Sequence, residues 1–273
     1  MGGMSDRLTL MTVHAHPDDE TITTGGIMAK YAAESVRVVC VTSNKGENGK
    51  IFVPELDTPE NHARLAEIRE IELARALAHL GAIEHRWLGY RDSGMMGWPS
   101  NDTPSAFWHA DVTAAAVRLG ALIERFRPQV VVTYDENGFY GHPDHIQAHR
   151  VTVRACEATG IPDKLYYPAV PVSAIPRMAA LLAARGVEVP DDLADAPFGT
   201  PDELIGAVVD CGVVAGAKFD SLAAHASQAE NIFFLSLGKE LFAELFTEEA
   251  FVRARDRTGA SGRETDLFAG LRD

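Results

Sequence analysis

The sequence predicts an α/β fold, a three-layer, Rossmann-like open sheet that is mostly parallel and carries helices on both faces. Short, almost uninterrupted apolar runs alternate along the chain with longer segments whose apolar residues recur at helical spacing. Runs of the first kind are typical of parallel strands, which are buried on both faces. Because a helix connects each strand to the next, we expect crossover connections and a parallel sheet.

Strands and helices are expected to alternate from residue 8 onward. LTLMTV (8–13) is the first strand, the segment 25–33 has the apolar spacing of a helix, and VRVVCVT (36–42) is the second strand. The charged helix expected at 60–81 ends at a glycine, which is a common helix stop.

The same alternation continues with a short strand at 85–90 and a helix that ends at Phe126. QVVVTYD (129–135) is the next strand, and a helix at 144–160 follows it. The pattern then weakens. The last expected elements are a strand at 164–170, a helix at 173–185, a strand at 207–212 and a helix at 215–228.

One domain is expected over residues 1–273, because this length with 46% hydrophobic residues can bury one large core and no boundary is evident. Residues 1–7 are interpreted as a leader without function and 187–203 as a loop insert. The charged, glycine-containing segment 254–273 is interpreted as a loop or mobile tail. The insert and residues 233–246 carry no recognisable chemistry; we expect them to shape a substrate mouth or a contact in a homo-oligomer.

The charge of the chain restricts its partners. A formal net charge of −14 disfavours nucleic acid and anionic membranes, which are bound by clustered lysines and arginines. No apolar stretch approaches the roughly 20 residues that span a bilayer, and no secretory signal is evident, so a cytoplasmic protein without membrane insertion is expected. The three cysteines lie far apart in apolar contexts and are expected to be buried and reduced.

Long loops follow the expected strands at 43–59, 91–105 and 135–143. In open parallel sheets, ligands bind beyond the carboxyl ends of the strands. HAHPDDE (14–20) follows the first strand in the same way. Four segments are therefore expected to converge on one edge of the sheet.

Two histidine-rich clusters follow strands, HAHPDDE at 14–20 and DENGFYGHPDHIQAH at 135–149. Catalytic zinc takes three nitrogen or oxygen ligands from the protein and leaves a fourth position open. His16, Asp19 and His145 would make such a set, and a bound dication would offset the repulsion between the adjacent carboxylates. Two imidazoles favour zinc, although other divalent metals suit the same donors.

Two further residues of the second cluster have alternative interpretations. Asp144 is either the N-cap of the helix that follows or a partner that orients a histidine. His149 lies four residues after His145 on the same helical face, where it supports a ligand or packs in the core.

These motifs resemble the LmbE-like or PIG-L family of zinc-dependent N-deacetylases. The resemblance rests on AHPDDE, the later HPDH, RxxEL (69–73), LGYRDSGM (88–95) and HASQ (225–228), and it covers roughly residues 8–230. The two His-Pro-Asp clusters are its specific part. The family's substrates include GlcNAc-phosphatidylinositol, mycothiol-pathway compounds and glycosylated antibiotics.

The resemblance implies one Zn²⁺ per chain, held by His16, Asp19 and His145. It also implies that Asp18 is the general base and that His142 stabilises or protonates the tetrahedral intermediate. These roles agree with the chemistry, because a carboxylate beside the metal can accept a proton from the water that attacks an amide.

Four residues are expected to bind substrate. The resemblance implies this role for Arg69, although a surface ion pair is the alternative. Glu47 and Asp92 lie in strand-end loops, where a hydroxyl-rich sugar needs carboxylate acceptors, or they are ordinary turn residues. Tyr140 could donate a hydrogen bond to the oxyanion or simply pack.

The expected function is hydrolysis of the N-acetyl group of a GlcNAc-type sugar or glycoconjugate. An amidase acting on a larger amide, such as a mycothiol S-conjugate or an N-acyl antibiotic, is the alternative. A non-catalytic metal-binding or sugar-binding protein is a distant one. A nucleotide-binding module is disfavoured, because the first strand-to-helix turn has three carboxylates and lacks the glycine fingerprint.

Overall fold

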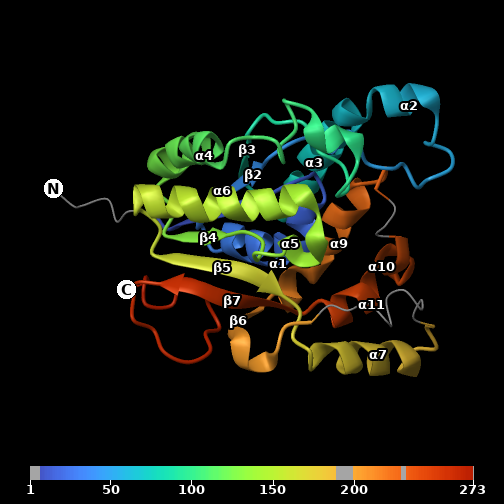
Figure 1. Cartoon of the computed structure of the whole chain (residues 1–273). Helices are drawn as coiled ribbons and strands as arrows, with labels where there is room; N and C mark the ends of the chain where they lie inside the picture. The colour runs from blue at the N-terminus through green and yellow to red at the C-terminus, as the bar shows by residue number, and fades with distance from the viewer. Residues whose placement is uncertain (1–6, 189–198, 229–231, 273) are drawn as a thin grey trace.

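The computed structural model describes residues 7–188, 199–228 and 232–272. Within these residues, seven strands form one sheet in the order β3-β2-β1-β4-β5-β7-β6 (Figure 1). Neighbours from β3 to β5 are parallel, whereas β7 is antiparallel to both β5 and β6. The strands are β1 (Thr9–His14), β2 (Arg37–Thr42), β3 (Ile83–Trp87), β4 (Val130–Val132), β5 (Lys164–Ala169), β6 (Ile205–Asp210) and β7 (Glu248–Asp256).

Helices cover both faces of this sheet, so the predicted three-layer, mostly parallel α/β fold is confirmed. The longer helices are α1 (Asp19–Ala33), α3 (Leu65–Leu80), α4 (Val112–Phe126), α6 (Pro143–Thr159), α7 (Ala174–Ala184) and α9 (Ala215–Ala224). Shorter ones are α2 (Pro59–Ala63), α5 (Gly138–Gly141), α10 (Ile232–Ser236) and α11 (Gly238–Leu245), and 3₁₀ turns lie at η1 (Pro99–Asp102), η2 (Asp202–Leu204) and η3 (Gly212–Val214).

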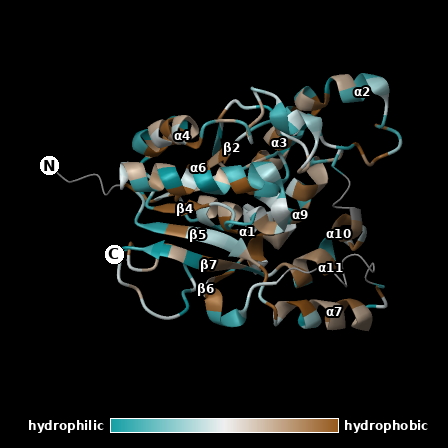
Figure 2. Ribbon diagram, viewed as in Figure 1, coloured by the Kyte–Doolittle hydropathy of each residue, from teal (hydrophilic) through white to brown (hydrophobic). Residues whose placement is uncertain are grey.

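Alternate residues of the central strands belong to two separate hydrophobic cores, one on each face of the sheet. Val38 and Cys40 of β2 pack with α1 and α3 on one face, whereas Val39 and Val41 pack with α4 and α6 on the other. Figure 2 shows hydrophobic and hydrophilic residues alternating along α4 and α6, as expected for helices with one buried face. Burial on both faces explains why these strands are almost continuously apolar.

The structure corrects the expected helix at 60–81. The helix is interrupted at Arg64, whose backbone (φ −119°, ψ 20°) is not helical, and this break separates α2 from α3. The expected helix at 215–228 is also shorter, because α9 ends at Ala224 and the HASQ motif continues as a turn.

The segment 254–273, interpreted as a loop or mobile tail, is the end of a strand followed by a loop that packs on the core over the residues described. Residues 254–256 belong to β7, and the loop after them stays at that end of the sheet, where Glu264 bridges to Ala207 of β6 (Figure 1). Leu267 and Phe268 are fully buried, and the Phe268 ring packs edge-on against Tyr31 of α1. A segment rich in charge and glycine therefore completes one of the two cores.

Some expectations are only partly addressed by the described residues. Residues 1–6 of the expected leader and 189–198 of the expected insert lie outside them. All three cysteines are free and buried, as predicted. None of the helices in the described segments is long and apolar enough to cross a membrane.

Candidate active site

The structure brings His16, Asp19 and His145 together at the carboxyl edge of the sheet. His16 lies in the turn after β1, Asp19 opens α1, and His145 lies in the first turn of α6. His16 Nδ1 is 3.3 Å from Asp19 Oδ2 and 3.3 Å from His145 Nε2, and the remaining edge, His145 Nε2 to Asp19 Oδ2, is 3.4 Å. All three side chains are buried.

This triangle fits a tetrahedral metal ion. Ligands that each lie about 2.0–2.1 Å from a tetrahedral zinc are separated from one another by roughly 3.3–3.4 Å. The three donor atoms have these separations. The donor set, two imidazole nitrogens and one carboxylate oxygen, also suits zinc.

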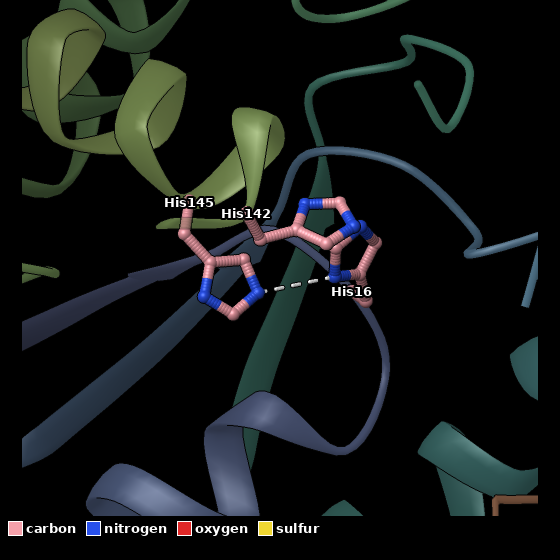
Figure 3. A group of neighbouring side chains, drawn as sticks. All are labelled: His16, His142 and His145. Carbon is pink, nitrogen blue, oxygen red and sulfur yellow. Dashed lines mark hydrogen bonds between the residues drawn. The ribbon is translucent and has the colours of Figure 1, made fainter. Parts of the chain in front are cut away.

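In the neutral form of each ring, hydrogen bonds outside the triangle favour a lone pair on the facing nitrogens of His16 and His145. His145 Nδ1 lies 3.2 Å from the Gly138 carbonyl oxygen, to which it can only donate, so Nε2 carries a lone pair. His16 Nε2 lies 3.3 Å from Asp144 Oδ2, which leaves a lone pair on Nδ1. Two lone pairs therefore face each other (Figure 3), an arrangement that a cation between them stabilises.

The electrostatics of this group favour positive charge. Burial alone would lower the pKa of His16, but hydrogen bonds to Asp144, Asp19 and Asp92 outweigh it and raise the pKa well above its ordinary value. Burial alone would raise the pKa of Asp19, yet the neighbouring histidines hold it well below its usual range. A dication bound among these atoms would neutralise the negative charge of the carboxylates.

His142 is the N-cap of α6 and lies beside the triangle. Its ring centroid is 4.6 Å from that of His16 and 5.0 Å from that of His145 (Figure 3). Its Nδ1 accepts the N–H of Asp144 at 3.1 Å, so the neutral ring carries its proton on Nε2. Burial, reinforced by the charges of the two other histidines, lowers the pKa of His142 to about 2. The ring is therefore a neutral hydrogen-bond donor.

Asp144 contacts His16, as a partner that orients a histidine would, and the N-cap of α6 is His142 instead of Asp144. The fully buried Oδ2 of Asp144 accepts hydrogen bonds from Asn44 Nδ2 at 2.8 Å and Ser93 N at 3.0 Å, besides its contact with His16. Asp92 supports the same ring, because its Oδ1 lies 3.7 Å from His16 Nε2. A carboxylate partner fixes the tautomer and orientation of a ligating histidine.

Asp18 has a strained backbone and a buried ion-pair partner. Its φ is +107°, which is unusual for a residue with a side chain. Arg69 donates to the Gly46 carbonyl at 2.8 Å and lies 3.3 Å from Asp18 Oδ2, and the arginine side chain is only 4% exposed. Burial raises the pKa of Asp18 to about 7, against the opposing charge of Arg69. This value suits a general base near neutral pH.

The remaining predicted residues surround this group. Tyr140 is 58% exposed, and its ring centroid lies 5.0 Å from that of His145. Glu47 forms an ion pair with Arg91 at 3.0 Å, and its Oε2 is buried without a hydrogen bond. His149 Nδ1 lies 2.9 Å from the Tyr134 carbonyl oxygen, in the layer behind the histidines. Substrate binding by Arg69, Asp92, Tyr140 and Glu47 stays a prediction.

Sequence reasoning missed three residues that hold the site. Tyr134 stacks on His145 with ring centroids 4.2 Å apart, and its hydroxyl accepts the Ala15 N–H at 2.9 Å. Asn44 binds Asp144, and Gly138 supplies the carbonyl that His145 faces. A Cβ on Gly138 would lie 2.7 Å from His145 Cβ, so only glycine fits. Tyr134 and Asn44 each stand just after a strand, which is the signal that could have found them.

Comparison with known proteins places the chain in a family. Residues 11–156 match the model of the PIG-L family, which is described as GlcNAc-PI de-N-acetylase. This chain belongs to the PIG-L family. A 1D-myo-inositol 2-acetamido-2-deoxy-alpha-D-glucopyranoside deacetylase from Acidothermus cellulolyticus is 47% identical over 277 residues, which cover 96% of this chain and 95% of that protein. The predicted family and the predicted class of amide hydrolase are therefore confirmed.

Solved structures support the fold of this PIG-L family member. An N,N'-diacetylchitobiose deacetylase from Pyrococcus horikoshii matches with a TM-score of 0.57 at 19% identity, covering 92% of this chain and 85% of its own. A 4-carboxy-2-hydroxymuconate hydratase from Pseudomonas putida matches with a TM-score of 0.61 at 18% identity, covering 93% and 99%. Because proteins with this fold catalyse different reactions, chemistry must be argued from the site.

Proposed function

We propose that this PIG-L family member is a zinc-dependent deacetylase that releases acetate from a GlcNAc-containing small molecule, with GlcNAc-inositol as the first candidate. The substrate class is supported by the relative from Acidothermus cellulolyticus, whose name describes that deacetylation. The metal is supported by one observation above all, the triangle of His16, Asp19 and His145 with edges of 3.3, 3.3 and 3.4 Å.

Zinc held by these three residues would lower the pKa of water and polarise the amide carbonyl. Asp18 accepts a proton from the attacking water, a role that suits a carboxyl whose pKa burial raises to about 7. Arg69 forms an ion pair with the Asp18 carboxylate at 3.3 Å. Asp18 and Asp19 thus act differently although they are adjacent.

His142 is proposed to donate a hydrogen bond to the oxygen of the reacting carbonyl. Its Nε2–H is available, because Nδ1 is occupied by the Asp144 N–H. A fixed neutral donor stabilises negative charge as it develops on the carbonyl oxygen. The proton that Asp18 takes from the water is the one returned to the leaving amine, so removing the His142 ring removes the donor to the carbonyl oxygen.

Substrate contacts are proposed for the residues around this group. Tyr140 lies exposed beside His142 and His145, where its hydroxyl can reach a ligand. Glu47 has a buried carboxylate oxygen without a hydrogen bond, which suits a sugar hydroxyl. Arg69 and Asp92 complete the proposed set. Arg69 also contacts Asp18, and Asp92 also lies near His16.

The test measures which carboxylic acid the zinc-loaded protein releases from GlcNAc-inositol, GlcNAc, an N-acylated glycopeptide and a mycothiol S-conjugate. We expect acetate from GlcNAc-inositol and little release of larger acids. Asp18→Asn should keep one zinc per chain and lose turnover by roughly 10²–10⁴-fold. Turnover that survives in Asp18→Asn, or in protein without metal, would refute the mechanism. If a larger acid is released in preference to acetate, the protein is an amidase for larger amides and not a deacetylase.

A further inference from the structure

The strained backbone of Asp18 depends on one buried acceptor. The N–H of Asp18 donates to Glu20 Oε2 at 2.8 Å, two residues ahead in the chain. Asp18 precedes α1 without capping the helix through its own side chain. Glu20 therefore fixes the peptide that sets the direction of the Asp18 side chain.

Glu20 is itself held by a histidine from a distant part of the chain. Its Oε1 lies 2.8 Å from His225 Nε2 and also accepts the Thr21 hydroxyl at 2.7 Å. Both side chains of the Glu20–His225 pair are 0% exposed. A carboxylate buried this deeply needs a donor, and His225 supplies it.

His225 begins the HASQ motif, whose other polar residues bind the neighbouring elements. The backbone N–H and the hydroxyl of Ser227 donate to Glu72 of α3 at 2.8 and 2.6 Å. The Ser227 carbonyl accepts the N–H of Phe52, and Gln228 donates to the Lys50 carbonyl, both at 3.4 Å. The motif therefore joins α1, α3 and the loop after β2, three segments that surround Asp18 and Arg69.

We propose that the Glu20–His225 pair is a positioning element for Asp18, anchored in the fold by Ser227 and Gln228. Neither residue touches the reacting atoms; the pair acts by holding residue 18 at positive φ, with its carboxylate beside Arg69. This inference rests on the proposed role of Asp18 as general base. It gives a purpose to HASQ, a motif that the proposed chemistry leaves unused.

The test compares three variants of the full chain. His225→Leu removes the donor to Glu20, whereas His225→Gln keeps a donor on a side chain of similar reach. Glu249→Gln is a matched control: Glu249 is buried, binds Lys218 at 2.7 Å and accepts the N–H groups of Gly26 and Ile27 in the middle of α1. Glu249 belongs to β7 and binds the helix that carries Glu20, outside the site.

We expect His225→Leu to bind one zinc and to lose 10- to 100-fold in kcat with KM within threefold of the wild type. His225→Gln should recover kcat to within threefold of the wild type. Glu249→Gln should unfold at a lower temperature with kcat within twofold. A wild-type kcat in His225→Leu, or an equal loss of kcat in the control, overturns the inference. If His225→Leu does not fold, His225→Asn, whose donor falls short of Glu20, carries the same expectation.

A second measurement is independent of turnover. Crystal structures of metal-free wild type and His225→Leu should show that residue 18 keeps positive φ and its contact with Arg69 only in the wild type. An unchanged residue 18 in the variant overturns the positioning role. If the wild type releases no acid from any substrate while residue 18 moves as expected, the proposed function fails and the structural inference stands.

Discussion

The Nδ1 atom of His16 and the Nε2 atom of His145 lie 3.3 Å apart (Figure 3), and the other nitrogen of each ring faces an acceptor, Asp144 Oδ2 or the Gly138 carbonyl. Neither facing nitrogen has a proton to share in the neutral rings. With both rings neutral, two electron pairs and the Asp19 carboxylate therefore lie together, and a proton or a metal cation among them stabilises the arrangement. Binding of a cation at this site should therefore stabilise the folded state.

Removing the metal should accordingly destabilise the protein. At a zinc concentration 100-fold above Kd, binding stabilises the folded state by about 2.7 kcal/mol, or roughly 5–10 °C in Tm for a chain of this size. Dialysis against a chelator followed by thermal unfolding measures this difference. One equivalent of zinc should restore the original Tm, whereas magnesium should not. An unchanged Tm and no zinc by elemental analysis would contradict the site.

His145 and His142 should respond differently to substitution, although both rings lie beside His16. His145→Ala should lose the zinc, because it removes one corner of the triangle. His142→Ala should keep one zinc and lose roughly 10²–10³-fold in kcat, the usual cost of removing an oxyanion donor. Zinc content by elemental analysis and steady-state kinetics separate the two. Equal loss of zinc from both variants would show that His142 is a ligand.

Asp144→Ala should weaken zinc binding without removing a ligand. The substitution leaves His16, Asn44 and Ser93 without their common acceptor. Loss of such a partner typically costs 10–100-fold in metal affinity. Competition with a chromophoric chelator measures Kd. Asp144→Asn keeps an oxygen acceptor and should lie between Asp144→Ala and the wild type; a Kd unchanged in both variants would show that the carboxylate does not support the site.

The inner parallel strands β1, β2 and β4 were predictable because they are buried on both faces and carry few charges. The edge strand β3, expected at 85–90, is half-buried and lies at Ile83–Trp87. β7 was not predictable, because its apolar run, Ala250 to Val252, is only three residues long and charged residues flank it on both sides. Their charges are matched by residues outside the strand: Arg253 lies 3.3 Å from Glu264, and the buried Glu249 pairs with Lys218. The break at Arg64 was also missed, since neither glycine nor proline marks it.

In the active site, the sequence predicted which residues meet but left their orientation open. Strand ends place His16 and the segment around His145 on one edge of the sheet, so their proximity follows from topology. The ring tautomers depend instead on the Gly138 carbonyl and on Asp144, and these contacts exist only after the loops fold. The support for Asp18 likewise comes from His225, about 200 residues later in the chain. The sequence of the HASQ motif alone did not indicate this contact.

The C-terminal segment should contribute to stability as much as a core helix does. Phe268→Ala removes a fully buried ring that packs against Tyr31, and such truncations cost about 3–5 kcal/mol. Urea unfolding measures the loss. Val117→Ala, at a position 69% exposed, is the control and should change stability by less than about 0.5 kcal/mol. A loss for Phe268→Ala as small as the control's would mean that the segment is detached in solution.

Stability should also fall on acidification through a histidine remote from the metal ligands. Burial lowers the pKa of His85 to about 4, and the charge of Arg86 acts in the same direction. Its Nε2 lies 3.0 Å from the Thr42 hydroxyl, and its ring packs edge-on against Trp87. In the unfolded chain the same ring titrates near pH 6.5. Between these values the unfolded state binds more protons, so the free energy of unfolding rises with pH and falls as pH drops from about 6.5 to about 4.

His85→Gln should flatten this part of the pH profile, because glutamine does not titrate. At about 1.4 kcal/mol per pKa unit, the contribution of His85 amounts to at most about 3 kcal/mol at the acid end of the window. Urea unfolding of both proteins at several pH values between 7 and 4 measures the difference. Carboxylates titrate alike in the two proteins and cancel in that difference, which should change steadily below pH 6.5. Parallel profiles would show that His85 is protonated as readily in the folded protein as in the unfolded chain.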